Sequence, residues 1–203
     1  MRIQELKFEE RINKSEKLTF QIMENLFERK LIKRFFKTKL QEDIAGTDFL
    51  TSFDNKNDLK IQFKLRQDKW KDIPICRYQP FRGIDNCVVG RDYKSITNDV
   101  NDFYFVATQN REQKFDEVYV TETNKLKKLI IDAEKEWFPD SQAWDFFTQG
   151  VYQKYMDLRL FSKKIREASN GVEAWFKKNP NEGSGKINYY VPVSYADTIL
   201  KLL

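Results

Sequence analysis

The chain has 203 residues, of which 40% are hydrophobic and 15% aromatic, enough for one sizeable core in a globular protein. Its formal net charge of +5 is a mild excess that permits a polyanionic partner without requiring one. The sequence contains no histidine, which excludes Ser-His-Asp and Cys-His hydrolytic sites, histidine zinc sites and nucleases with a histidine base.

The cysteine content and the hydropathy pattern bear on the compartment. Cys76 and Cys87 are too few for a zinc cluster, and the sequence has no signal peptide or long apolar run. We therefore expect a cytoplasmic protein with reduced thiols and no membrane segment.

The first predicted element is an amphipathic helix. Its hydrophobic residues between Leu18 and Leu31 fall on one arc at about 100° per residue. Glu16 projects within that arc, whereas Glu24 lies at its margin and Glu28 outside it, so Glu16 is the candidate site residue. Asn13-x-x-Glu16 also fits a capping box, in which Glu16 would only satisfy a backbone amide. The cations that follow complement the helix dipole: Arg29, Lys30, Lys33, Arg34, Lys37 and Lys39.

The segment from Ile44 to Arg66 predicts a β-hairpin. Hydrophobic and polar residues alternate on both sides of a polar turn at 54–58. If Phe53 pairs with Leu59, Asp48 opposes Lys64 and Leu50 opposes Gln62. Polar residues then share one face, while the aromatic face packs into a core and holds the register.

On these residues the chain resembles the PD-(D/E)XK nuclease superfamily, which includes restriction endonucleases, Holliday-junction resolvases and Mrr-like enzymes. The matching motifs are Gly46-Thr47-Asp48 and Ile61-Gln62-Phe63-Lys64. The family places an acidic residue at the start of one strand, a second ligand and a lysine two residues apart on the next, and often a glutamate on an upstream helix. Thr47 replaces the proline of the motif, and Gln62 replaces a carboxylate, as in some Mrr-like members.

The resemblance implies a metal-dependent DNA endonuclease that hydrolyses phosphodiester bonds. Asp48, the carbonyl oxygen of Gln62 and Glu16 would bind Mg²⁺ or Mn²⁺, and Lys64 would position the attacking water or neutralise charge on the phosphate. Because an amide oxygen carries no charge, Gln62 would hold the cation less tightly than a carboxylate. Two alternatives stay open: a noncatalytic nucleic-acid-binding protein with this fold, and a structural hairpin with an exposed Asp48–Lys64 ion pair. A homodimer is expected from the resemblance alone.

The segment from Lys69 to Asp99 is predicted to be a long irregular loop in which aromatic residues alternate with cations. Such side chains can stack on bases and bind phosphates, although the aromatics can equally anchor the loop to the core. Arg82, beside Gly83, is the first candidate for DNA contact. The full set of candidates is Arg66, Arg77, Arg82, Arg91 and Lys94.

The remaining pattern predicts strands at 103–107 and 118–120, then a helix from Thr121 or Thr123 to about Phe138, ended by Pro139. After Pro139 we expect helices within 144–161, a helical turn at 172–176, a loop at 179–185, a strand at 187–193 and a last helix at 195–203. The fold class is thus α/β: a restriction-endonuclease-like α/β/α core with a mixed central sheet at 1–138, and a helical C-terminal elaboration at 139–203.

Overall fold

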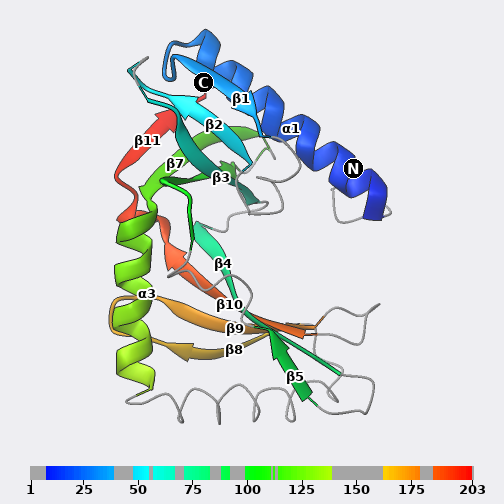
Figure 1. Ribbon diagram of the computed structural model, residues 1–203, viewed down its shortest axis with the longest axis vertical. Helices are drawn as coiled ribbons and strands as arrows, with labels where there is room; N and C mark the ends of the chain where they lie inside the picture. The colour runs from blue at the N-terminus through cyan, green and yellow to red at the C-terminus, as the bar shows by residue number, and fades with distance from the viewer. Residues whose placement is uncertain are drawn as a thin grey trace. The chain divides into compact units, whose positions relative to one another are not determined.

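The computed structural model describes residues 8–38, 48–54, 57–66, 71–82, 88–91, 99–110, 112, 114–138, 162–178 and 185–202. The chain folds into two compact units. The first unit contains Met1–Lys71, Val100–Thr123 and Ala196–Leu203, and the second contains Asp72–Asp99 and Asn124–Tyr195. Each unit has its own β-sheet (Figure 1).

The first unit is a mixed six-stranded sheet with one long helix. Its strand order is β1-β2-β3-β6-β7-β11; β3 and β6 are parallel, and the other neighbouring pairs are antiparallel. This agrees with the predicted α/β class and mixed sheet. The elements are α1 (Phe8–Glu28), β1 (Arg34–Lys37), β2 (Phe49–Ser52), β3 (Leu59–Arg66), β6 (Phe103–Gln109), β7 (Phe115–Glu122) and β11 (Thr198–Lys201).

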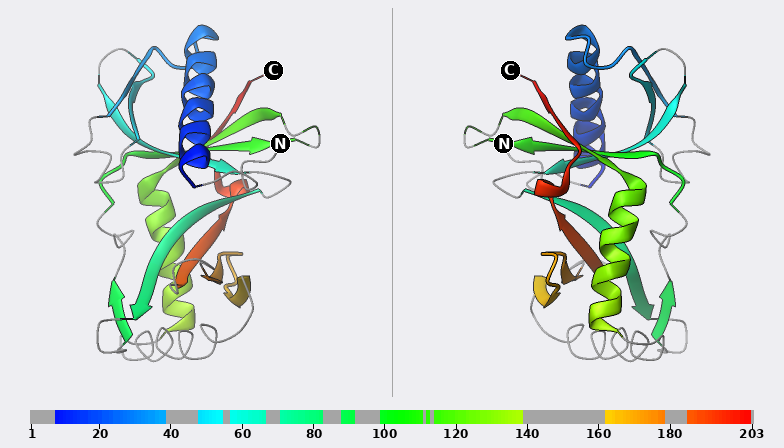
Figure 2. Two further views of the ribbon diagram at one scale, coloured as in Figure 1. Left: turned by 90° about the vertical axis from the view of Figure 1, so that its right-hand side faces the viewer. Right: turned by 90° about the vertical axis from the view of Figure 1, so that its left-hand side faces the viewer.

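The core of this unit lies between α1 and one face of the sheet, and Figure 2 shows the helix lying across that face. From α1, Ile22, Met23 and Leu26 are buried in the core cluster with side chains of β2, β3, β6, β7 and β11. A row of ring contacts joins the strands, with centroids 6.2 Å apart for Phe49 and Phe63 and 6.3 Å apart for Phe63 and Phe105. Alternate residues of β2 and β3 therefore point into the core and leave their neighbours on the opposite face.

The register of the β2–β3 hairpin differs from the prediction by two residues. Phe49 pairs with Ile61 and Thr51 with Leu59, whereas the sequence analysis paired Phe53 with Leu59. The physical reason is the position of Phe53, which leaves the strand and packs its ring against Phe103 and Phe105, with centroids 6.0 and 6.2 Å apart. Because the shift is even, each side chain keeps its predicted face, but every cross-strand partner changes.

In its described residues, the second unit has a five-stranded antiparallel sheet of order β5-β4-β10-β9-β8 and one α-helix, α3. The hydroxyl of Tyr189 in β10 donates to Glu134 of α3 at 2.9 Å, and its ring meets that of Trp137 with centroids 5.5 Å apart. The elements are β4 (Asp72–Arg82), β5 (Val88–Arg91), α3 (Thr123–Trp137), β8 (Ser162–Glu167), β9 (Glu173–Lys178), β10 (Gly185–Pro192) and the 3-10 helix η3 (Val193–Tyr195).

Several predicted elements are confirmed here and others are wrong. The strands at 103–107, 118–120 and 187–193 and the helix from Thr123 are present. The predicted helical turn at 172–176 is mostly strand β9, and the predicted helix at 195–203 is the end of η3 followed by β11. Both are short segments in which buried and exposed residues alternate with a period of two, so the hydrophobic residues were assigned the wrong period.

The region after Pro139 was predicted to be a helical elaboration, and this is wrong where the structure describes it. Residues 162–178 and 185–202 form β8 to β11 and η3. The helices expected within 144–161 lie outside the described residues.

The segment 69–99 was predicted to be irregular, but it contains β4 and β5. β4 pairs with β10, and this partner is too distant in sequence to leave a local signal of the strand. The two units interleave along the chain.

In the part of the chain that the structure describes, no helix is both long and apolar enough to cross a membrane.

We expect Phe105→Ala to destabilise the first unit by about 3–5 kcal/mol, because it removes a fully buried ring and leaves a cavity. Urea denaturation followed by circular dichroism measures the change. Phe36→Ala is the matched control; this ring on β1 is 54% exposed, so its loss should change stability by no more than about 0.5 kcal/mol. Equal losses in the two variants would contradict this description of the core.

Candidate functional site

Asp48 is held at the start of β2 by backbone hydrogen bonds on both sides. Its N–H donates to the carbonyl of Ile61 in β3 at 2.8 Å. Its own carbonyl accepts from the N–H and from the hydroxyl of Thr38, which follows β1, both at 3.2 Å. The backbone position of Asp48 is therefore set by both neighbouring strands.

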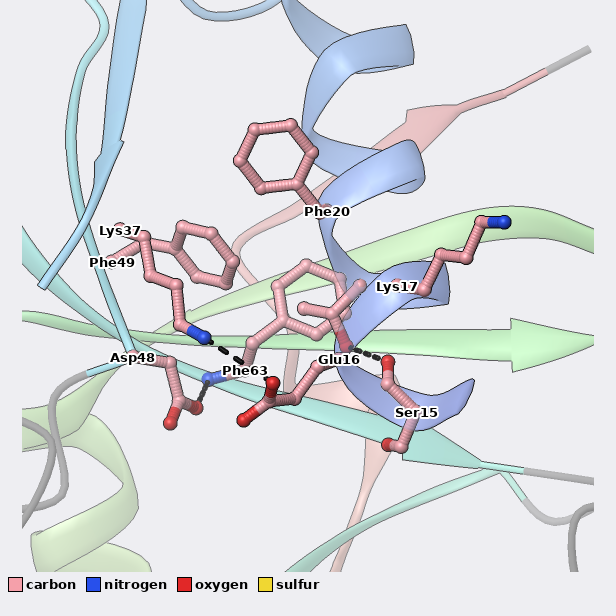
Figure 3. Close-up of a pocket in the computed structure, with 9 residues that line it drawn as sticks. Ser15, Glu16, Lys17, Phe20, Lys37, Asp48, Phe49 and Phe63 are labelled. Carbon is pink, nitrogen blue, oxygen red and sulfur yellow. Dashed lines mark hydrogen bonds and ion pairs between the residues drawn. The ribbon is translucent and has the colours of Figure 1, made fainter. Parts of the chain in front are cut away.

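The carboxylate of Asp48 reaches across to β3. Its Oδ2 accepts from the side-chain Nε2 of Gln62 and from the backbone N–H of Phe63, each at 2.6 Å; Figure 3 shows the bond to Phe63. Both donors are neutral, so they fix the carboxylate without cancelling its negative charge. The structure thus brings Asp48 and Gln62 into direct contact, as partners on the shared polar face.

Lys64 is the next residue of β3 on the same face as Gln62, and its side chain is half-buried. The corrected register makes Gln62, rather than Lys64, the neighbour of Asp48 across the hairpin. Lys64 takes the diagonal position, and such positions lie about 7–8 Å apart, within reach of a long side chain. The three motif residues therefore occupy adjacent positions on one face.

Glu16 lies on α1 and lines a pocket together with Asp48. Its Oε2 is 3.3 Å from Nζ of Lys37, and the two side chains are 53% and 51% exposed. The capping-box interpretation of Asn13-x-x-Glu16 is wrong, because α1 begins at Phe8 and these residues lie within the helix. Glu16 is thus near Asp48, but its carboxylate is paired with a cation.

The pocket lies on the side of the sheet that α1 covers (Figure 3). Its volume is about 430 Å³, and it is bounded by α1, β1 and the hairpin. Phe49 and Phe63, which also belong to the core, form its apolar wall. The lining residues are Ser15, Glu16, Lys17, Thr19, Phe20, Lys37, Asp48, Phe49 and Phe63.

Lys37 is a residue of this site that sequence reasoning missed. The sequence analysis grouped it with cations at the end of the first helix, but α1 ends at Glu28 and Lys37 belongs to β1. Alternation within Arg34–Lys37 offered a weak signal, since Lys37 shares the α1 side of the sheet with Phe35. Its partner Glu16 is distant in sequence, so only the packing of α1 against β1 reveals the pair.

The predicted DNA-contacting residues are divided between the two units. Arg66 ends β3 in the first unit and is half-buried. Arg77 and Arg82 lie in β4 and Arg91 in β5 of the second unit, and the placement of their side chains is not described. Lys94 lies outside the described residues. Of the five candidates, Arg66 is therefore the one that the structure places on the same strand as Gln62 and Lys64.

The oxygen donors at Asp48 suit a hard cation with few protein ligands. Mg²⁺ retains several waters and commonly binds one or two carboxylates together with substrate phosphates. Asp48 supplies a carboxylate, and Gln62, in direct contact with it, supplies an amide oxygen that can turn toward a cation. In the described part of the chain, no three Asp, Glu, His or Cys side chains gather into a metal-binding group.

A second polar cluster lies farther across the same sheet, around Glu117 of β7. Tyr119 donates its hydroxyl to Oε2 of Glu117 at 2.6 Å, Lys71 lies 3.5 Å from the same oxygen, and Lys201 pairs with Oε1. The bonds from Lys201 and Tyr119 lower the pKa of Glu117 to about 2. The same cluster raises the pKa of Lys201, chiefly through its bond to Glu117. Cations neutralise this carboxylate, so it serves stability.

Comparisons with known proteins add no family to this description, because no family model, no curated protein and no solved structure matches the chain. The resemblance to the PD-(D/E)XK superfamily stays a prediction.

We expect Glu117→Gln to lower the free energy of unfolding at pH 7 by about 1–2 kcal/mol, because it removes the charge that the lysines and Tyr119 stabilise. The loss is smaller than the full pKa shift implies, because the lysines are exposed and solvent screens their charge. The folded-state pKa lies below the ordinary value, so the contribution of Glu117 is complete above about pH 5 and is lost as the pH falls toward 2. The difference in free energy of unfolding between wild type and variant, measured by urea denaturation, should therefore fall by about pH 3 to less than half of its value at pH 7.

Glu112→Gln is the control for this titration. Glu112 is 71% exposed and pairs only with Lys114 among the described ion pairs, so its substitution should change stability by no more than about 0.5 kcal/mol at any pH. A Glu117→Gln deficit that stayed constant from pH 7 to pH 3 would contradict the assigned pKa.

Proposed function

We propose that the chain is a metal-dependent deoxyribonuclease that hydrolyses phosphodiester bonds. One observation carries the proposal: neutral donors from Gln62 and Phe63 hold the Asp48 carboxylate at 2.6 Å, and Lys64 follows on the same face. A fixed anionic oxygen next to an amide and an amine is a suitable arrangement for binding a cation and a phosphate together.

Asp48 and the carbonyl oxygen of Gln62 would hold Mg²⁺ or Mn²⁺. Glu16 approaches Asp48 from the α1 side and pairs with Lys37, so we do not assign it to this ion. The ion, when bound, would polarise the phosphate and lower the pKa of an attacking water. The hydrogen bond from the backbone N–H of Phe63 to Oδ2 keeps Asp48 oriented whether or not Gln62 turns its carbonyl oxygen toward a cation. This preorganisation removes the cost of ordering the carboxylate when substrate arrives.

Lys64 would act on the phosphate. Its ammonium would stabilise the negative charge that grows on the nonbridging oxygens or position the attacking water, and partial burial strengthens either interaction. Arg66, two residues further along the same strand, would contact a neighbouring phosphate and set the position of the DNA backbone. Cleavage of both strands of a duplex would require a second active site, consistent with the expected homodimer.

A noncatalytic DNA-binding protein is the second candidate function, and two contacts favour it. Gln62 presents its NH₂ group, not its carbonyl oxygen, to Asp48, and Lys37 neutralises Glu16. Both contacts weaken the attraction for a cation. This candidate predicts DNA binding without Mg²⁺-dependent cleavage.

The enzyme proposal is tested with linear, nicked, single-stranded and four-way-junction DNA, each with Mg²⁺, with Mn²⁺ and with EDTA. We expect cleavage only with a divalent cation, and losses of about 100-fold or more in Asp48→Asn and in Lys64→Ala, because each removes charge that acts in the transition state. Lys60→Ala is the matched control. Lys60 is exposed on the same face of β3, two residues before Gln62, and its loss should leave the rate within about twofold.

If Asp48→Asn and Lys64→Ala cleave as fast as wild type, the catalytic assignment is wrong. Metal-independent DNA binding by wild type, with no cleavage of any of the four substrates, would instead support the noncatalytic candidate.

Gln62→Glu tests the metal site directly. A second carboxylate beside Asp48 should lower the Mg²⁺ concentration that gives half-maximal activity by about tenfold, because it adds a charged oxygen ligand. Without metal, repulsion between the two carboxylates should lower the melting temperature, and added Mg²⁺ should restore it. An unchanged or increased Mg²⁺ requirement would contradict the assignment of Gln62 as a ligand.

A further inference from the structure

The pocket beside Asp48 has no role in the chemistry proposed above. Asp48 contributes to its lining, so an occupant would lie next to the candidate catalytic carboxylate. At about 430 Å³ the pocket falls within the range of small-ligand sites, which begins near 300 Å³. The described lining residues all belong to the first unit.

One wall of the pocket offers an accessible aromatic ring. Phe20 of α1 is 40% exposed, unlike Phe49 and Phe63, which are buried. The ring of Phe20 meets the ring of Phe35 edge-on, with centroids 5.3 Å apart, so its orientation is supported from behind. An accessible and supported ring is a suitable platform for a nucleobase, because every base has a face that can stack.

Another part of the pocket lining is polar. Lys37 and Glu16 form their ion pair there, and Figure 3 shows the amine of Lys37 directed toward the Glu16 carboxylate beside Asp48. The pair presents a hydrogen-bond donor and an acceptor within 3.3 Å of each other. An ammonium can bind a phosphate, and a carboxylate can accept from a base donor, either a ring N–H such as that of thymine or an exocyclic amine.

We infer that this pocket binds one unpaired nucleotide of the DNA substrate, adjacent to the phosphate that is cleaved. The base would stack on Phe20, and its phosphate would lie toward Lys37. The inference rests on the proposed nuclease function and specifies its substrate: single-stranded or frayed DNA. A base inside an intact duplex is already stacked and paired, and extruding it costs a few kcal/mol, so duplex DNA is the poorer ligand.

The pocket is tested by binding without catalysis. Fluorescence anisotropy with a labelled oligothymidylate of about 12 nucleotides in EDTA measures affinity while no strand is cut. Phe20→Ala should weaken binding about tenfold, because stacking of a base on an aromatic ring is worth about 1–3 kcal/mol. Phe20→Trp, which keeps an aromatic platform, should restore affinity to within about threefold of wild type.

Phe27→Ala is the matched control. Phe27 is on the same helix, is 47% exposed, and contacts the ring of Phe35 with centroids 6.2 Å apart, but it does not line the pocket. Its loss should leave oligothymidylate binding within about twofold of wild type. Urea denaturation of both variants separates any loss of fold from loss of binding.

Three results would overturn the inference: no binding of oligothymidylate by wild type, equal weakening by Phe20→Ala and Phe27→Ala, or tighter binding of a matched duplex than of the single strand. The nuclease proposal fails on a different measurement, namely the cleavage rates of Asp48→Asn and Lys64→Ala with divalent metal. A folded Phe20→Ala that loses oligothymidylate binding supports the pocket even where those two variants cleave like wild type.

Discussion

The first unit depends, at its candidate site, on the two hydrogen bonds that Oδ2 of Asp48 accepts from Gln62 and Phe63. β2 begins only at Phe49, so the Asp48 side chain occupies the place where the backbone pairing of the hairpin stops. The carboxylate satisfies a backbone donor of β3 that would otherwise lack a strand partner. One side chain therefore ends the pairing, orients Gln62 and presents a negative charge at the edge of a pocket.

Asp48 and Glu117, two of the carboxylates on this sheet, differ in the chemistry of the groups bound to them. Glu117 is surrounded by Lys71, Lys201 and the hydroxyl of Tyr119, and its pKa falls to about 2. The bonds that Oδ2 of Asp48 accepts from Gln62 and Phe63 come from an amide and a peptide group, which are neutral donors. A carboxylate can thus serve stability, as at Glu117, or form part of a candidate site, as at Asp48, and the groups that donate to it decide between the two roles.

The candidate metal site and the pocket share Asp48 but use opposite faces of the hairpin. Gln62 and Lys64 lie on the face away from α1, while Glu16, Phe20 and Lys37 approach from the α1 side. The aromatic contacts that build the core, from Phe35 through Phe49 to Phe63, also support the wall of the pocket. Packing in this unit therefore positions both the candidate metal site at Asp48 and the pocket proposed to bind a nucleotide.

The sequence by itself determined the faces of the hairpin, the helix that precedes it and the strands at 103–107 and 118–120, because alternation and helical phase are local properties of the chain. It could not determine the register, since that depends on Phe53 packing against Phe103 and Phe105. It also could not reveal the pairing of β4 with β10 or the contact between Glu16 and Lys37. These contacts join residues distant in sequence, and their energies come from tertiary packing, so only the folded structure decided that Asp48 meets Gln62 and borders a pocket.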